Sequence, residues 1–495
     1  MIKIPKVMST QHPDNVNIPF FAESSDMSGD DEVQEAYYAF SHLGCDEQMW
    51  DSEGKEVDDF VVRKLLSKYP HFFKQHRLGQ DVFITLRLPN PSIEKTEAKI
   101  LVEALESIPR SADAAKLFYN DLTYPPIFEV ILPMTTSDEE LNRVYYFYKN
   151  FISGKQYQQI YPGDISIANW VGSFNPESIN VIPLIEDIDT MLKADKIIIS
   201  YLENKQIDYL RVFLARSDPA LNYSMISAVL ANKIALKSLE DVSKNTGVKI
   251  YPIIGMGSPP FRGNLTPCNV DKVLQEYSSV ETFTVQSAFK YDNRVEDVIA
   301  AIKKIKNFIR VPIKELDKEL ALKFIEKSKV EYQRIIEKIA ALINEIASFI
   351  PQRRTRKLHI GLFGYTRKLG KIKLPRAISF CAACYSIGLP PEIIGLSAFN
   401  KEELNQLKQL YTNLEFDIAC AIKYFNSNCL ELFDTEIKEI VIKSLNLINT
   451  LDLETSINTE HKEITDRIIK EIKQPITSNI TELIIEAAHL RKFLG

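Results

Sequence analysis

Short apolar runs alternate with longer helix-like segments through the middle of the chain. Six runs between residues 80 and 290 are rich in β-branched and aromatic side chains. They cover residues 81–89, 127–133, 179–187, 209–218, 248–257 and 280–287. The helix-like segments between them include residues 92–108, 136–152, 187–204 and 221–245. Nearly continuous apolar strands separated by helices are typical of a parallel sheet that is covered on both faces. The pattern therefore predicts an α/β fold.

Two further candidate strands, at 357–364 and 391–395, bring the number to eight, which is the number that closes a TIM (β/α)8 barrel. The alternative is an open doubly wound sheet, which usually carries a glycine-rich dinucleotide turn after its first strand. No such turn is present in the sequence. We therefore predict a TIM barrel with helical insertions and a helical C-terminal region.

The predicted organisation has three parts. Residues 1–79 form an N-terminal segment, residues 80–399 the barrel, and residues 400–495 the helical C-terminal region. Within the barrel, residues 294–350 read as a helical insertion between strands six and seven, because isoleucines such as Ile335, Ile339 and Ile346 recur at helical spacing. In the N-terminal segment, "MSTQHPDN" at 8–15 reads as a polar turn that carries His12, for which a solvated surface histidine is the alternative interpretation.

Composition narrows the class of protein. Lys and Arg number 60 against 66 Asp and Glu, for a net charge of -6, so the chain lacks the broad cationic face that nucleic acid binding needs. Six cysteines in 495 residues suit a reducing compartment, and no apolar stretch reaches the length of a membrane span. We expect a cytoplasmic protein without nucleic acid or membrane partners. Cys381 and Cys384 form a CxxC in an apolar helical run, which we interpret as buried thiols, with zinc or redox chemistry as the alternative.

Charged and polar side chains follow the predicted strands where each one ends. They are Arg87, Glu186, Arg216, Asp218, Arg262, Gln286 and Lys290. In an α/β barrel the carboxyl ends of the strands form the reactive rim. Glu186 and Asp218 end neighbouring strands, so their carboxylates could share Mg²⁺ or Mn²⁺. They could equally cap the helices that follow them, and the residue types alone do not separate the two interpretations.

Two segments are candidate anion sites. "GMGSPPFRGN" at 255–264 follows the fifth predicted strand, and we expect a rigid, exposed loop whose Arg262 can make paired hydrogen bonds to phosphate or carboxylate. A surface arginine on an irregular turn is the alternative. The segment 353–378 is rich in Lys and Arg and looks like a second phosphate or bicarbonate region, with Arg367 and Arg376 as its candidate residues.

Several of these motifs, in this order, resemble the archaeal-type phosphoenolpyruvate carboxylases over nearly the whole chain. They are "MSTQHPDN", "EQMWDSEGK", "IPLIEDID", "FLARSDPALNYS", "GMGSPPFRGN", "TVQSAFKYD" and the stretch 359–395. The resemblance implies that phosphoenolpyruvate and bicarbonate give oxaloacetate and phosphate, through carboxyphosphate and an enolate stabilised by Mg²⁺ or Mn²⁺. It makes His12 the essential histidine, Glu186 and Asp218 the metal ligands, and Arg262 the arginine that faces the phosphoryl group. It also implies a homotetramer with C-terminal helices in its contacts, and aspartate inhibition through the region of Arg367 and Arg376.

The chain departs from the longer form of the family at two positions. Met256 stands in place of an arginine of that form's Gly-Arg-Gly-Gly repeat, and Leu221 stands in place of a lysine after the metal-binding aspartate. Arg216 and Arg87 are our candidates for supplying the two missing positive charges. The rival interpretations are another metal-dependent barrel lyase or aldolase that acts on enolpyruvate or 2-oxo acids, and a homologue without catalytic activity.

Overall fold

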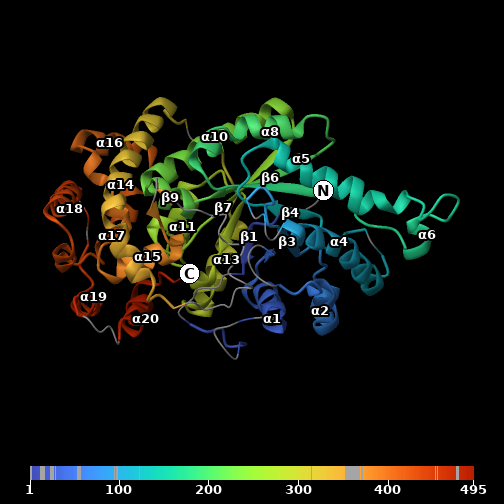
Figure 1. Ribbon diagram of the computed structural model, residues 1–495, viewed down its shortest axis with the longest axis horizontal. Helices are drawn as coiled ribbons and strands as arrows, with labels where there is room; N and C mark the ends of the chain where they lie inside the picture. Colours follow the sequence, from blue (N-terminus) through green and yellow to red (C-terminus); the bar gives the residue numbers. More distant parts are fainter. Residues whose placement is uncertain are drawn as a thin grey trace.

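A closed barrel of eight parallel strands forms the centre of the protein in a computed structural model (Figure 1). The structure describes residues 3–494 except 12–16, 23–26, 28, 53–56, 94, 96–97, 122, 314, 352–367, 370–371, 452, 454 and 475–478. The barrel strands are β1 Val7–Thr10, β2 Glu47–Asp51, β3 Phe83–Arg87, β4 Glu129–Leu132, β5 Asn180–Ile185, β6 Tyr209–Ala215, β7 Lys249–Gly255 and β8 Thr282–Val285. They are ordered as in the chain, and β1 closes the barrel by pairing with β8 in the register Met8 with Thr284. The predicted TIM barrel is confirmed.

Two of the eight strands lie elsewhere than predicted. The first two barrel strands, β1 and β2, come from the segment before residue 80, so "MST" is strand and not turn. The expected strand at 391–395 is wrong, because Pro391–Ile393 forms a short 3₁₀ helix, η6. The expected strand at 357–364 falls outside the described residues. β1 and β2 escaped the apolar criterion because they carry polar side chains that are nevertheless buried, such as Ser9 and Glu47.

A buried arginine explains why such polar strands are tolerated. Arg211 of β6 donates two hydrogen bonds to the carboxylate of Glu47, each of 2.7 Å, one of 3.0 Å to Glu129 and one of 3.2 Å to Thr282. Glu47, Glu129 and Thr282 are the first residues of β2, β4 and β8, so the cluster fills the N-terminal end of the barrel interior. Buried charges are tolerated when they are paired and hydrogen-bonded in this way.

Helices surround the barrel and connect its strands. Those up to β8 are α1 Asp30–Tyr38, η1 Ala39–Leu43, α2 Val61–Lys68, α3 Pro70–Gln75, α4 Ala98–Tyr119, α5 Asp138–Phe147, η2 Tyr148–Ser153, η3 Gly154–Tyr157, α6 Ile167–Val171, α7 Ile188–Met191, α8 Ala194–Leu202, α9 Ser217–Tyr223, α10 Met225–Thr246, η4 Pro260–Arg262 and α11 Val270–Glu276. Those after β8 are α12 Ser287–Tyr291, α13 Val295–Asn307, α14 Lys318–Ala347, α15 Ala377–Ser386, η6, η7 Leu396–Ala398, α16 Lys401–Leu410, α17 Leu414–Ile422, η8 Ser427–Leu432, α18 Thr435–Ile448, α19 Thr459–Ile472 and α20 Ile480–Arg491. A two-stranded antiparallel sheet, β9 Lys368–Leu369 with β10 Ile372–Lys373, precedes α15.

The predicted helical insertion is helical but does not interrupt the barrel. Since β8 ends at Val285, α13 follows the last barrel strand and α14 begins after the barrel is complete. α14 buries the predicted stripe that includes Ile335, Ile339 and Ile346. Helices α16 to α20 confirm the helical C-terminal region, and Figure 1 shows them together with α14 at the end of the molecule opposite α6.

Helix α15 contains the CxxC pair. Cys381 and Cys384 are fully buried and unpaired, and burial raises the pKa of both thiols. The interpretation as buried thiols is therefore confirmed. Among the described residues, no single helix has both the length and the apolar character needed to cross a bilayer. One pair of helical segments, Ala377–Ser386 and Pro391–Ala398, is long and apolar enough only when the two are counted together across a 97° bend.

Candidate active site

The predicted site residues gather at the carboxyl ends of the barrel strands. Arg87 is the last residue of β3, and Glu186, Arg216 and Gln286 directly follow β5, β6 and β8. Because the strands are parallel in a closed barrel, these ends share one rim. Ile185 pairs with Leu214, which puts Glu186 level with the last residue of β6.

The structure separates the two interpretations of Glu186. Helix α7 is capped by the neighbouring Asp187, whose carboxylate accepts hydrogen bonds from the backbone N–H groups of Asp189 at 3.0 Å and Thr190 at 2.9 Å. Glu186 is buried, and its Oε2 accepts a 2.8 Å bond from the backbone N–H of Met134, which lies beyond the end of β4. The capping interpretation of Glu186 is therefore wrong.

Asp218 lies on the adjacent strand connection. It is the second residue of α9, whose N-cap position is taken by Arg216 without a side-chain capping bond. Asp218 is therefore not the N-cap either. Within the part of the chain that the structure describes, no group of three or more His, Cys, Asp or Glu side chains is arranged to hold a metal ion. A site based on Glu186 and Asp218 would consequently have two protein carboxylates and fill its other positions with water or substrate.

Arg262 connects this pair of strands to β8. Its Nε donates to Ser217 Oγ at 3.2 Å, and its Nη2 donates to Gln286 Oε1 at 2.5 Å. Ser217 is the chain neighbour of Asp218, so the guanidinium lies beside the acidic connection after β6. The alternative of a loose surface arginine is wrong, because Arg262 is only 2% exposed.

The loop that carries Arg262 was predicted to be exposed, and that prediction is wrong. Its backbone folds back on itself, with Gly257 N–H donating to the Arg262 carbonyl at 2.8 Å, and residues 256–265 are buried. A side chain at Gly257 would displace the Arg262 guanidinium, because a Cβ there would lie 2.7 Å from the guanidinium carbon. The loop is buried because segments that follow the barrel, including α15, η6 and α17, pack against it, a contact that the sequence pattern did not reveal.

Two buried acids from the covering region hold this loop. The backbone N–H of Phe261 donates to Glu392 Oε1 at 2.8 Å, and the hydroxyl of Tyr385 donates to the same oxygen at 2.8 Å. Asn264 donates to Asp417 Oδ1 at 2.7 Å. Burial raises the pKa of Glu392 and raises that of Asp417 to about 7. Both acids were missed because residues 391–395 were predicted to be a strand and residues 400–495 were predicted only to be a helical region.

Arg216 is turned towards the same loop. It is 1% exposed, and its guanidinium donates to the Tyr277 hydroxyl at 3.2 Å, the Phe261 carbonyl at 3.2 Å and the Pro260 carbonyl at 3.4 Å. This geometry argues against direct contact with substrate. Arg216 is better described as a positioning residue that holds the segment before Arg262.

The remaining cations lie on the β1–β3 side of the rim. Arg87 forms a two-point ion pair with Asp51, with both distances 2.8 Å, and the two residues are register partners on β3 and β2. Lys290 is fully buried and donates 3.0 Å bonds to Ser9 Oγ, the Thr10 carbonyl and Glu35 Oε1. Asp51 was missed in the sequence because β2 was missed.

His12 and Arg367 lie outside the described residues. The described chain before this gap ends with β1, whose last residue is Thr10, and with Gln11. Gln11 is buried, and its Oε1 accepts a 3.0 Å bond from the backbone N–H of Asp51. Arg376 is partly buried at the N-cap of α15, away from the barrel strands in sequence.

The fold and the rim define a class: a (β/α)8-barrel enzyme whose rim combines adjacent carboxylates with a buried, hydrogen-bonded guanidinium. Comparison with known proteins narrows this class. Residues 4–495 match the family described as phosphoenolpyruvate carboxylase. Curated proteins named phosphoenolpyruvate carboxylase from Methanospirillum hungatei and Methanothermobacter thermautotrophicus are each 51% identical over 494 residues, covering 100% of both chains. One from Halobacterium salinarum is 45% identical over 499 residues, again with full coverage. The chain belongs to the phosphoenolpyruvate carboxylase family.

Proposed function

We propose that the protein is a carboxy-lyase that joins bicarbonate to phosphoenolpyruvate and releases oxaloacetate and inorganic phosphate. The observation that carries this function is the position of Arg262, held between Ser217 and Gln286 beside the connection that contains Asp218. Family membership over residues 4–495 supports the same reaction.

The reaction generates negative charge at two places. Transfer of the phosphoryl group to bicarbonate breaks its bond to the enol oxygen, forms carboxyphosphate and leaves the enolate of pyruvate. Arg262 is suited to the phosphoryl oxygens, because a guanidinium that is already fixed by Ser217 and Gln286 needs little rearrangement as charge develops. Arg87, whose side chain is 23% exposed, is the second cation at this rim that could meet an anionic substrate.

Glu186 and Asp218 fit a divalent metal such as Mg²⁺ or Mn²⁺. Both donors are carboxylate oxygens, which hard cations prefer. Glu186 does not cap α7, because Asp187 is the N-cap of that helix. When bound, such an ion would act as a Lewis acid and stabilise developing charge on substrate oxygens. Removal of divalent ions with a chelator should therefore abolish activity, and addition of Mg²⁺ or Mn²⁺ should restore it.

Carboxyphosphate must lose its proton before it divides into carbon dioxide and phosphate, and the enolate then attacks carbon dioxide. We assign this proton transfer to His12, because an imidazole exchanges protons near neutral pH. Support comes from Lys290, which ties the end of β1, two residues before His12, to the rim.

The remaining assignments extend the same proposal. Arg367 and Arg376 would bind a second anion, with aspartate as the candidate inhibitor. The assembly would be a homotetramer, and the six free cysteines favour the cytoplasm.

The experiment is phosphoenolpyruvate turnover coupled to malate dehydrogenase and NADH, with phosphate release measured in parallel. Oxaloacetate and phosphate should appear in equal amounts, and both should require bicarbonate. Phosphate release that ignores bicarbonate would favour a different barrel lyase, and no turnover would favour a non-catalytic homologue. In His12→Asn, oxaloacetate formation should fall about 10²- to 10⁴-fold, with pyruvate released instead. Undiminished oxaloacetate would remove His12 from the mechanism.

A further inference from the structure

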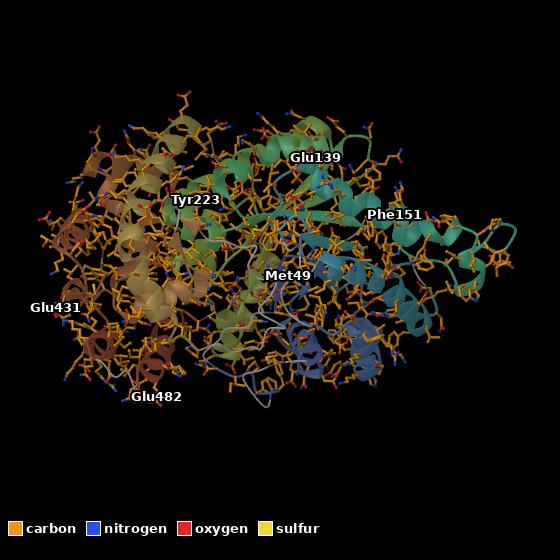
Figure 2. The ribbon with its side chains drawn as sticks, viewed as in Figure 1. Met49, Glu139, Phe151, Tyr223, Glu431 and Glu482 are labelled. Atoms are coloured by element: carbon orange, nitrogen blue, oxygen red, sulfur yellow. The ribbon has the colours of Figure 1, made fainter. Side chains whose placement is uncertain are left out.

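The last helix of the chain ends in a buried arginine. Helix α20 packs against α15, and Arg491 is its final residue. Figure 2 shows Glu482, in the first turn of α20, at the edge of the molecule, where this side chain is exposed. Arg491 at the other end of the helix is only 7% exposed. Because a buried guanidinium is costly without compensating contacts, the groups around Arg491 have to account for its position.

Two tyrosines surround the Arg491 guanidinium. Its central carbon lies 4.7 Å from the ring centroid of Tyr385 and 5.2 Å from that of Tyr424, so both rings can stabilise the positive charge. Its Nη2 also donates a 3.4 Å hydrogen bond to the hydroxyl of Tyr385. This hydroxyl connects Arg491 to the residues beyond it.

The next residue in this set of contacts is Glu392 of η6, which is fully buried. The Tyr385 hydroxyl donates to Glu392 Oε1 at 2.8 Å, and the same oxygen accepts the backbone N–H of Phe261 at 2.8 Å. Burial raises the pKa of the Glu392 carboxyl group, and the positive charge of Arg491 is the largest effect that opposes this rise. Arg491 therefore favours the ionised carboxylate, which accepts hydrogen bonds about twice as strongly as a neutral oxygen.

Phe261 connects these contacts to the candidate active site, because it directly precedes Arg262. Its N–H is held by Glu392, and its carbonyl accepts a 3.2 Å bond from Arg216. Its ring packs against Phe380 of α15, with 5.6 Å between the ring centroids. Two buried side chains of opposite charge therefore hold the backbone of the residue next to Arg262. Weakening either contact would allow the peptide before Arg262 to shift.

We propose that Arg491 is a positioning residue for Arg262: its positive charge sustains the Glu392 carboxylate that fixes the Phe261 backbone. The inference rests on the proposed function, in which Arg262 meets the phosphoryl oxygens of the substrate. The last helix would thus contribute to the active site through Tyr385 and Glu392, without touching substrate itself.

Hydrogen exchange measured by mass spectrometry tests this set of contacts without turnover. Arg491→Met keeps a long side chain between the tyrosine rings but removes the charge. Exchange of the Phe261 amide, followed in peptides that cover residues 256–265, should accelerate at least about 10-fold, as expected when a hydrogen bond to a charged acceptor is weakened. The matched control is Arg467→Met in α19, which removes an exposed 3.3 Å ion pair with Glu486 of α20 and should leave this exchange unchanged.

Two further variants make the exchange experiment specific. Adding Glu392→Gln to Arg491→Met removes the unpaired acid and keeps an oxygen that can accept from Phe261, so it should return the exchange towards the wild-type rate. Tyr385→Phe removes only the connecting hydroxyl and should accelerate the exchange even if Arg491→Met does not fold. Wild-type exchange in Arg491→Met, or in Tyr385→Phe where the first variant is unfolded, would overturn the proposal. A double variant without recovery would overturn it as well.

Coupled turnover of the folded variants then reports on Arg262. In Arg491→Met, kcat/KM for phosphoenolpyruvate should fall about 10- to 100-fold with a rise in KM, because the displaced guanidinium no longer meets the phosphoryl group. A purely structural role would lower the folded fraction, and hence kcat, at unchanged KM, and that result would refute the positioning role. Wild-type protein without bicarbonate-dependent turnover would instead refute the proposed function, while the exchange rates would still decide whether Arg491 holds the loop.

Discussion

Replacing Arg216 tests whether this side chain positions the Arg262 loop or binds substrate. In Arg216→Met the Phe261 carbonyl, the Pro260 carbonyl and the Tyr277 hydroxyl each lose a charged donor. A buried polar group left without its partner costs about 1–3 kcal/mol, while removal of a buried cation with three neutral partners returns part of that cost. We expect a net loss of about 2–4 kcal/mol in the free energy of unfolding.

Activity should fall as well, because the loop carries Arg262. A displacement of about 1 Å at a reacting group typically costs about 10²-fold in rate. The comparison is Arg262→Met, which should lose at least as much activity, about 10²- to 10³-fold, with a smaller change in stability. Urea denaturation and coupled turnover of both variants measure the two quantities. If Arg216→Met keeps wild-type stability but loses activity, Arg216 binds substrate directly and the positioning assignment is refuted.

Three further substitutions follow from the described contacts. Gly257→Ala should displace the Arg262 guanidinium, whose carbon would lie 2.7 Å from the added Cβ. We expect kcat to fall by about 10- to 100-fold and the free energy of unfolding to change by less than about 1 kcal/mol. Unchanged turnover would contradict this prediction. Arg211→Met leaves the carboxylates of Glu47 and Glu129 buried without their cation and should lower the free energy of unfolding by about 3–5 kcal/mol. Adding Glu47→Gln and Glu129→Gln to this variant should recover most of the loss. Wild-type stability of Arg211→Met would show that the cluster is unimportant to stability. Asp417, with its pKa raised to about 7 in the folded state, keeps a proton that the unfolded chain releases near pH 4. This group therefore lowers stability by about 1.4 kcal/mol per unit as pH rises from about 4 to 7. Asp417→Asn should remove that slope, and urea titrations showing identical pH dependence in both proteins would exclude this cause.

The sequence predicted the part of the barrel that has an apolar signature. β3 to β8 are continuous runs buried on both sides, and each was located to within a few residues. β1 and β2 could not be found in this way, because their inward side chains are held by polar contacts, such as Arg211 to Glu47, that exist only in the closed barrel. Two segments, 357–364 and 391–395, were then added to make eight predicted strands, although both follow the last barrel strand in sequence.

The rim was predictable for the same reason: a parallel barrel brings strand ends together whatever their sequence. Glu186, Asp218, Arg262 and Gln286 needed only that rule. The support around Arg262 was not predictable, since Glu392 and Asp417 reach it from more than 100 residues away. Arg216 illustrates the limit, because its place after β6 is that of a substrate ligand and only its three partners reveal otherwise.

Closure of the barrel by β1 and β8 has a consequence for synthesis on the ribosome. β1 emerges about 275 residues before β8, the strand with which it pairs to close the barrel. At roughly 5–20 residues per second, the nascent chain spends roughly 15–55 s with an unsatisfied strand edge near its amino terminus. Chaperone access over that interval should therefore affect how much of this protein reaches its native state in a cell.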